Sequence, residues 1–481
     1  MRPHIGICLS IDPNTLKTSP LSSQEQRNQP TTQGSEILQR CVRSSNRSGA
    51  IRQFLPISAL LLGSAFLLFA GGINGLILPV RGNIEGFSSI SLGLLGTGWA
   101  LGYVAGCLLT PGLVARVGHI RAFGAFCAFA AVTILASAIV IEPWAWITLR
   151  GVCGFCFAGT AMVVESWLSE QTKPNQRGRV FGVYTMVNLG ANTAGYMMLV
   201  LGDPAGFFFF ALAAIFYCLA LVPTALSSTT TPAPLVSVKL NLRDLWRNSP
   251  VAVFAVFWVG VSNAAFGTLA AVYAQKVGLV LSAVAFFTAI PILAGAIMQI
   301  PVGMLSDKMD RRRVLLGVAS LALIADFAFI VIAPEGRTLN LILAALLGGS
   351  IYAMYPIIVA HANDHAAPGT AIQISGGLLL TYGIGSIVGP TVAGWAMETV
   401  GNRALFLTTA LSHGVVILYT LWRISRKAAV PEREKSSFQP INVGRTSSLQ
   451  TVEFSQNEPV EPPASDSLAA QSPEEAPDRT P

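Results

Sequence analysis

One apolar segment of the sequence carries two ionisable residues. Residues 143–168 contain Arg150 and Glu165 and no other charged side chain. A charge in apolar surroundings is costly unless it faces water or a partner. Arg150 therefore either contacts a solute or relays protons in a wet cavity, or it serves as a structural hydrogen-bond hub. Glu165 either carries a proton or forms a gate pair with Arg116, His119 or Arg121.

Neutral polar and aromatic side chains recur in the other apolar segments. Taken singly, each is better explained by packing or by a helix–helix hydrogen bond. As a set beside one cation, they predict a cavity for an amphipathic or weakly anionic organic solute. The set comprises Asn74, Trp99, Tyr103, Asn188, Asn192, Asn263, Gln299, Tyr352, Tyr355 and Tyr382. All but Trp99 and Tyr103 are assigned, with Arg150 and Glu165, to the substrate or proton pathway.

Charged residues at the ends of the apolar segments are candidates for gating. Asp307 is expected to be structural, because an anion is favoured at a helix N-terminus. We expect it to cap the helix that begins near residues 178–180 and so to hold one side of the protein shut. The predicted gating set is Arg116, His119, Arg121, Glu170, Arg177, Arg179, Asp307, Lys308, Arg311 and Asp364.

One loop holds residue types that bind metals, namely His361, Asp364 and His365. Solvated gate residues explain this grouping better than a metal site does. We therefore predict no metal and no cofactor.

Composition identifies a membrane protein. Of 481 residues, 52% are hydrophobic and 11% are charged, whereas soluble domains carry about 25% charged residues. Apolar blocks of roughly 20 residues are long enough to cross about 30 Å of hydrocarbon. These blocks lack the apolar–polar alternation of barrel strands, so they are predicted to be helices.

The remaining composition argues against other function classes. The net charge of +7 arises from basic residues in short loops, which indicates membrane topology rather than nucleic-acid binding. No Gly-x-x-x-x-Gly-Lys-Ser/Thr loop is present to bind ATP phosphates. No His/Asp/Glu cluster converges on one depth, so we predict that the protein is not an enzyme.

The sequence predicts twelve membrane-spanning helices and five regions. The spans are residues 56–80, 89–110, 122–141, 143–168, 180–202, 205–226, 250–274, 279–303, 314–333, 338–360, 372–396 and 402–424. The regions are a disordered arm (1–50), a six-helix bundle (51–226), a linker (227–248), a second six-helix bundle (249–425) and a disordered tail (426–481).

Positive charge predicts the orientation of these helices. The even-numbered loops hold Arg116, Arg121, Lys173, Arg177, Arg179, Lys239, Arg243, Arg247, Lys308, Arg311, Arg312 and Arg313, against Arg81, Lys276, Arg337 and Arg403 in the odd-numbered loops. Twelve against four places the even loops and both termini in the cytoplasm.

The two halves of the chain repeat each other at an offset near 190 residues. Residues 111–121 correspond to residues 303–313, and Asn74 corresponds to Asn263. Parallel repeats of six helices are typical of transporters.

Residues 50–425 resemble the major facilitator superfamily. The loop signature of that family, Gly-x-x-x-Asp-Arg/Lys-x-Gly-Arg-Arg/Lys, is matched best in the second half. The matching residues are Gly303, Asp307, Lys308, Arg311 and Arg312, whereas the first copy keeps only Arg116 and Gly118.

Further motifs support the resemblance. Residues 150–154 match an Arg-x-x-x-Gly element of many proton-coupled drug carriers, and residues 165–168 and 361–364 are similar to YcaD-type bacterial carriers. The resemblance implies that the third, sixth, ninth and twelfth helices are peripheral. Asp326 and His413, which lie in the ninth and twelfth, are therefore expected to have structural roles.

The predicted function is secondary transport of a small organic solute, coupled to protons, by alternating access at a site in the middle of the membrane. The expected partners are this solute, protons and the lipid bilayer, with no nucleic acid. We predict a monomer in a bacterial inner membrane. The alternative is a transport-inactive sensor or scaffold that binds partners through its linker and tail.

Overall fold

The computed structural model describes residues 32–173, 176–226, 242–366 and 370–426, together with Lys435 and Phe438. The chain divides into two compact units, residues 1–54 and residues 55–481, and all elements from α2 onward belong to the second unit. The described residues contain helices and no strand.

Helices follow the apolar blocks of the sequence closely. In the first half they are α1 (Thr32–Ile84), α2 (Ser89–Val117), α3 (His119–Ile139), α4 (Pro143–Gln171), α5 (Arg177–Met198), η2 (Leu199–Leu201), α6 (Phe208–Leu219) and α7 (Leu221–Ala225). In the second half they are α8 (Leu242–Asn248), α9 (Pro250–Lys276), α10 (Leu281–Lys308), α11 (Arg311–Val331), α12 (Arg337–Asn363), α13 (Ala371–Thr399) and α14 (Ala404–Arg426).

Eleven helices in the described part of the chain are long and apolar enough to cross a membrane. The one remaining predicted span, the fifth (180–202), corresponds to α5, which Arg177, Asn188 and Asn192 make less apolar. Helices therefore occupy the positions of all twelve predicted spans. The protein is a multi-pass integral membrane protein, and the predicted all-α membrane fold is confirmed.

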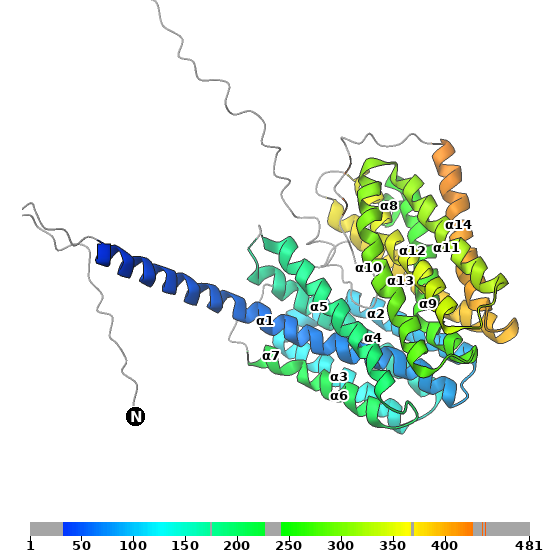
Figure 1. The fold of residues 1–481 in the computed structure, drawn as a ribbon, viewed down its shortest axis with the longest axis horizontal. Helices are drawn as coiled ribbons and strands as arrows, with labels where there is room; N and C mark the ends of the chain where they lie inside the picture. Colours follow the sequence, from blue (N-terminus) through cyan, green and yellow to red (C-terminus); the bar gives the residue numbers. More distant parts are fainter. Residues whose placement is uncertain are drawn as a thin grey trace, which may run out of the picture. The chain divides into compact units, whose positions relative to one another are not determined.

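The helices form two bundles (Figure 1). In the first, α4 packs against α2 and α3, and α3 packs against α6. In the second, α9 packs against α13 and α14, α10 against α12, and α11 against α12 and α14. The principal contact between the bundles is made by α2 and α13.

Small residues allow the closest helix contacts. Gly102 of α2 lies so near Gly151 of α4 that an added Cβ would overlap the Gly151 carbonyl oxygen. Across the bundles, a Cβ added at Gly93 of α2 would overlap the carbonyl oxygen of Pro390 in α13. Lipid offers no hydrophobic force between helices, so such close packing is what holds membrane helices together.

The structure departs from the sequence prediction at three places outside the spans. The predicted disordered arm (1–50) is helical from Thr32 onward, because extending an existing helix costs less than starting one. The predicted linker contains the helix α8, whereas residues 227–241 lie outside the described residues. Most of the predicted disordered tail also lies outside them, but Phe438 packs against Gly303.

Candidate functional site

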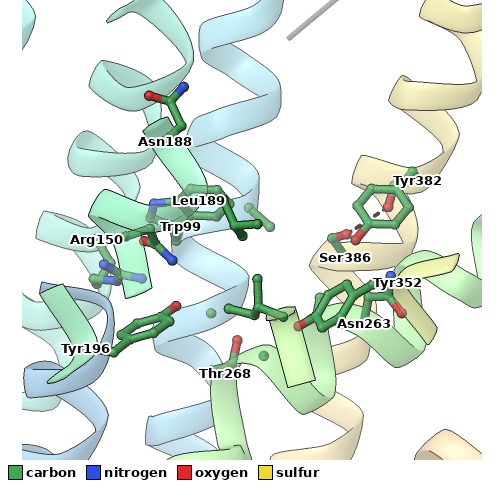
Figure 2. Close-up of a pocket in the computed structure, with 16 residues that line it drawn as sticks. Trp99, Arg150, Asn188, Leu189, Tyr196, Asn263, Thr268, Tyr352, Tyr382 and Ser386 are labelled. Carbon is green, nitrogen blue, oxygen red and sulfur yellow. Dashed lines mark hydrogen bonds between the residues drawn. The ribbon is translucent and has the colours of Figure 1, made fainter. Parts of the chain in front are cut away.

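A cavity of about 110 Å³ lies between the two bundles (Figure 2). Its wall contains residues from α2, α4 and α5 of the first bundle and from α9, α10, α12 and α13 of the second. The lining residues are Gly96, Trp99, Ala100, Arg150, Asn188, Leu189, Asn192, Tyr196, Asn263, Ala264, Gly267, Thr268, Ile292, Tyr352, Tyr382 and Ser386. Both halves of the chain therefore contribute to one polar and aromatic chamber.

Arg150 is the cationic side chain in the cavity wall, and it is only 5% exposed. Close packing of α4 on α2 through Gly154 and Gly102 brings Arg150 next to Trp99 (Figure 2). A guanidinium presents five donors in a rigid fork, which suits a carboxylate or another planar anion.

The opposite wall comes from the second bundle and is neutral. Tyr352, Tyr382, Ser386 and Asn263 gather there (Figure 2). Ser386 donates a 2.9 Å hydrogen bond to the carbonyl oxygen of Tyr382, one turn earlier in α13. This wall offers aromatic faces and an amide but no charge, so the cavity is electrostatically one-sided.

Glu165 lies behind the cavity wall and is fully buried. Tyr184 donates a 3.3 Å hydrogen bond to its carboxylate, and Asn188 lies one helical turn further along α5, on the same face as Tyr184. Ser64 in turn donates a 2.7 Å hydrogen bond to the Asn188 side-chain oxygen. Because Asn188 lines the cavity, the neighbouring polar side chains of Asn188 and Tyr184 lie between the cavity and Glu165.

The structure brings only part of the predicted pathway set to the cavity. Arg150, Asn188, Asn192, Asn263, Tyr352 and Tyr382 line it. Tyr355 packs behind Tyr382, with ring centroids 5.4 Å apart, and Gln299 donates a 3.3 Å hydrogen bond to the Tyr352 carbonyl.

Asn74 also lies outside the wall, although its counterpart Asn263 lines it. Its amide donates hydrogen bonds to Tyr217 (3.1 Å) and Cys153 (3.4 Å), within the first bundle. The repeat in sequence therefore does not extend to an equivalent position at the cavity.

Three polar lining residues were absent from the sequence prediction, namely Tyr196, Thr268 and Ser386. Helical spacing was a usable signal for two of them. Tyr196 follows Asn192 by four residues, and Ser386 follows Tyr382 by four, so each pair shares a helix face.

One end of the cavity is closed by direct contacts between the bundles. We call this the far end; it includes Ser89 at the start of α2 and Lys276 at the end of α9. Ser89 accepts a hydrogen bond from Lys276 (2.6 Å), and its backbone N–H donates to Glu398 of α13 (2.6 Å). Nearer the cavity, the hydroxyls of Thr97 and Thr391 lie 2.7 Å apart.

The opposite end, which we call the linker end, lies where α7 ends at Ala225 and α8 begins at Leu242. It carries the predicted gating residues. Arg116, Arg121, Glu170, Arg179 and Lys308 are exposed there, Arg177 is half-buried, and His119 is buried. The remaining three residues of the set form an ion-pair group.

Arg311 is buried at the centre of this group. It donates to Asp364 at 2.7 Å and lies 3.4 Å from Asp307. The same carboxylate oxygen of Asp307, Oδ1, also accepts a 3.2 Å hydrogen bond from the backbone N–H of Phe438 in the tail. The predicted cap on α5 is therefore absent among the described contacts of Asp307, which instead joins α10, α11 and the tail.

Asp310 precedes Arg311 and caps α11. Its carboxylate accepts hydrogen bonds from the Arg312 backbone N–H (3.0 Å) and guanidinium (2.8 Å). Burial alone would raise the pKa of Asp310, but these hydrogen bonds and the Arg312 charge lower the pKa below its ordinary value.

A family model described as Major Facilitator Superfamily matches residues 60–377 and 253–460. This chain belongs to that superfamily. The membership agrees with the resemblance drawn from the loop motifs, and it indicates a transporter rather than an enzyme.

Relatives and solved structures agree with this assignment. Proteins called "Uncharacterized MFS-type transporter YcaD" are 24% identical to this transporter. The relative from Salmonella heidelberg (strain SL476) matches over 385 residues, which cover 78% of this chain and 97% of the relative. The relative from Salmonella typhi matches over 383 residues, which cover 77% and 96%. The predicted likeness to YcaD-type carriers is thereby confirmed.

Two crystal structures share the fold. The nucleoside transporter NupG superposes with a TM-score of 0.66 at 15% identity, covering 77% of this chain and all of that chain. A bacterial homologue of the human lysosomal transporter Spinster, in an inward-facing and occupied conformation, gives a TM-score of 0.61 at 16% identity, covering 79% and 98%.

Proposed function

We propose that this chain is a proton-coupled secondary transporter that moves a small organic solute through the cavity by alternating access. The observation that carries the proposal is a buried arginine in the wall of a chamber to which both bundles contribute. A charge in the membrane region is retained at high cost, and a solute-binding role accounts for that cost.

The residues facing the chamber support a class of solute. Arg150 suits an anionic group, the amides of Asn188, Asn192 and Asn263 suit polar substituents, and the tyrosines suit an aromatic or apolar body. We infer a small organic anion, or a neutral solute with a polar end that accepts hydrogen bonds.

Glu165 supports coupling to protons. It is a buried carboxylate hydrogen-bonded to Tyr184, which lies one helical turn from Asn188 of the cavity wall, and a protonatable group so placed can exchange protons as the site is filled and emptied. The charge distribution of the loops supports placing the linker end in the cytoplasm of a bacterial cell, with both termini on that side.

The test begins with solute binding to purified protein. Candidate solutes are screened by thermal shift, and those that bind are followed by uptake into proteoliposomes with and without a pH gradient. We expect Arg150→Gln to abolish the thermal shift and the uptake, whereas Arg337→Gln should preserve both. Arg337 is a suitable control because it is exposed and lies over Phe286, away from the cavity.

Glu165→Gln tests the coupling separately. The variant should exchange solute across the membrane at a rate similar to that of the wild type but fail to accumulate it when a pH gradient is applied. If purified wild-type protein binds and moves none of the screened solutes, or if Arg150→Gln transports normally, the proposal is wrong.

A further inference from the structure

A second group of ionisable residues lies outside the cavity, inside the second bundle. Nδ1 of His413 in α14 lies 2.7 Å from Oδ2 of Asp326 in α11, and Asp326 also accepts a 2.6 Å hydrogen bond from Thr409. The other ring nitrogen of His413, Nε2, lies 2.8 Å from the hydroxyl of Ser262 in α9. Asp326, His413 and Ser262 are each at most 1% exposed, so one hydrogen-bonded chain joins three helices.

The polar partners of Asp326 all belong to this group of residues. The ion-pair and hydrogen-bond partners of Asp326 are His413 and Thr409 throughout the described residues. Ionisable side chains on the surrounding helices are engaged elsewhere: Tyr273 of α9 packs on Phe406 and Phe329, Arg337 of α12 lies over Phe286, and Glu398 of α13 binds Ser89.

The proton count of the pair is assigned with Asp326 ionised. An ionised carboxylate only accepts hydrogen bonds, so in this state Nδ1 of His413 carries a proton. If Nε2 carries none, the Ser262 hydroxyl donates to it, and the pair bears one net negative charge. If Nε2 gains a proton, the imidazolium donates to Ser262 instead, and the pair becomes neutral overall. A buried net charge is far more costly than a buried neutral pair.

We propose that Asp326 and His413 together form a second proton-binding site, distinct from Glu165, whose protonation is transmitted to the cavity by α9. Binding one proton at Nε2 reverses the direction of the hydrogen bond to Ser262. The Ser262 hydroxyl then accepts this bond and can donate its own proton to another acceptor. The next residue, Asn263, lines the cavity. This inference rests on the proposed transport function, since it assigns a second proton to the same cycle.

The link through Ser262 explains how a site between peripheral helices can influence the cavity. The helix α9 contacts α14 on one side and contributes Asn263, Ala264, Gly267 and Thr268 to the cavity wall on the other. A change in the hydrogen bond at Ser262 acts on the helix that carries this part of the wall. Solute binding in the cavity and proton binding at His413 therefore both act on α9, as coupling between the two sites requires.

Proton binding is measured directly by nitrogen NMR of the full-length protein with isotopically labelled histidine. The His413 resonances are assigned by difference from His413→Asn. We expect Nε2 of His413 to be found in both an unprotonated and a protonated form over the pH range in which the protein stays folded. The proposal is wrong if this resonance does not titrate, or if Asp326→Asn leaves its titration unchanged.

Transmission is measured as the distance between nitroxide labels at Lys173→Cys and Arg313→Cys, which are exposed on different bundles. The seven native cysteines are replaced by alanine. In a Glu165→Gln background, we expect the distance distribution still to change with pH, and Asp326→Asn to abolish that change. Ser262→Ala should keep the His413 titration and lose the distance change.

Ser412→Ala is the matched control, because Ser412 is equally buried in α14 but donates only within its own helix, to Thr408. It should behave as the parent protein. The proposal is overturned if the distance between the labels changes with pH in the same way in Glu165→Gln and in Glu165→Gln combined with Asp326→Asn. Uptake that is insensitive to a pH gradient, with the distance response intact, would instead contradict the coupling in the proposed function and leave the second proton site standing.

Discussion

Arg150 illustrates how a single residue obtains its surroundings from the residues beside it. Gly151 and Gly154 lie on the face of α4 that packs against the α2 backbone, and this close contact leaves Arg150 to face the cavity. The cost of a buried charge is thus met by orientation toward a polar chamber. Glu165, fifteen residues later, is also buried and accepts a hydrogen bond from Tyr184.

The stability of the linker end should depend on pH through Asp310. Its pKa is lowered in the folded state by Arg312, so the stabilisation is complete above the unfolded value of about 3.9 and is lost as the pH falls through the folded value. We expect Asp310→Asn to reduce stability by about 1–3 kcal/mol at pH 7. The difference in apparent Tm should be constant from pH 8 to 5 and shrink below about pH 4.

Thermal unfolding of purified protein across this pH range provides the measurement. Glu335→Gln serves as control, because Glu335 is exposed, and it should change the apparent Tm little at any pH. A difference for Asp310→Asn that grows as the pH falls would contradict the interpretation of the Arg312 contact.

At the scale of the helix, α2 and α4 pack so closely that we expect an added side-chain atom at their contact to be destabilising. Gly102→Ala places a methyl group against the Gly151 carbonyl oxygen, which belongs to rigid backbone. We expect a loss of about 1–3 kcal/mol, measured as a lower apparent Tm. Gly112→Ala, in the same helix with open space around it, should be neutral or slightly stabilising, because alanine favours the helix more than glycine.

Helices were easier to predict from the sequence than the faces they present. Long apolar blocks can form only membrane-spanning helices, so the spans and the fold class followed directly from composition. The cavity wall depends instead on helix rotation. Asn74 and Asn263 occupy corresponding positions in the repeat, yet only Asn263 faces the cavity.

Long-range pairing was the least accessible property. Nothing local in the sequence indicates that Asp326 meets His413, 87 residues later, or that Asp307 meets the tail at Phe438. Such partners are decided by how whole helices pack. Four-residue spacing within a helix was a signal that the prediction left unused, since Tyr196 follows the predicted Asn192 by one turn and also lines the cavity.

At the scale of the whole molecule, the proposed cycle requires the far end to open. The seal consists of α2–α13 contacts at Gly93 and Thr97, together with the hydrogen bonds that join Ser89 to Lys276 and Glu398. These contacts join the two bundles and leave the packing inside each bundle unaffected. Opening at this end therefore separates the packed α2–α13 helices and breaks a few polar contacts between the bundles.

A single substitution at Gly93 should hold that end open. Gly93→Leu places a side chain where the Pro390 carbonyl oxygen lies in the closed arrangement, so the bundles cannot meet there. Each bundle should still fold, because the clash lies between them. We expect Thr268→Cys in the cavity wall to react several-fold faster with a membrane-impermeant maleimide added at the far end in this variant than in the parent. Gly112→Leu, which meets no neighbour, should react like the parent. A leucine cannot occupy the closed interface without separating the two backbones. If the Gly93 variant keeps the parental apparent Tm but is labelled no faster than the parent, then the α2–α13 contact is not the seal.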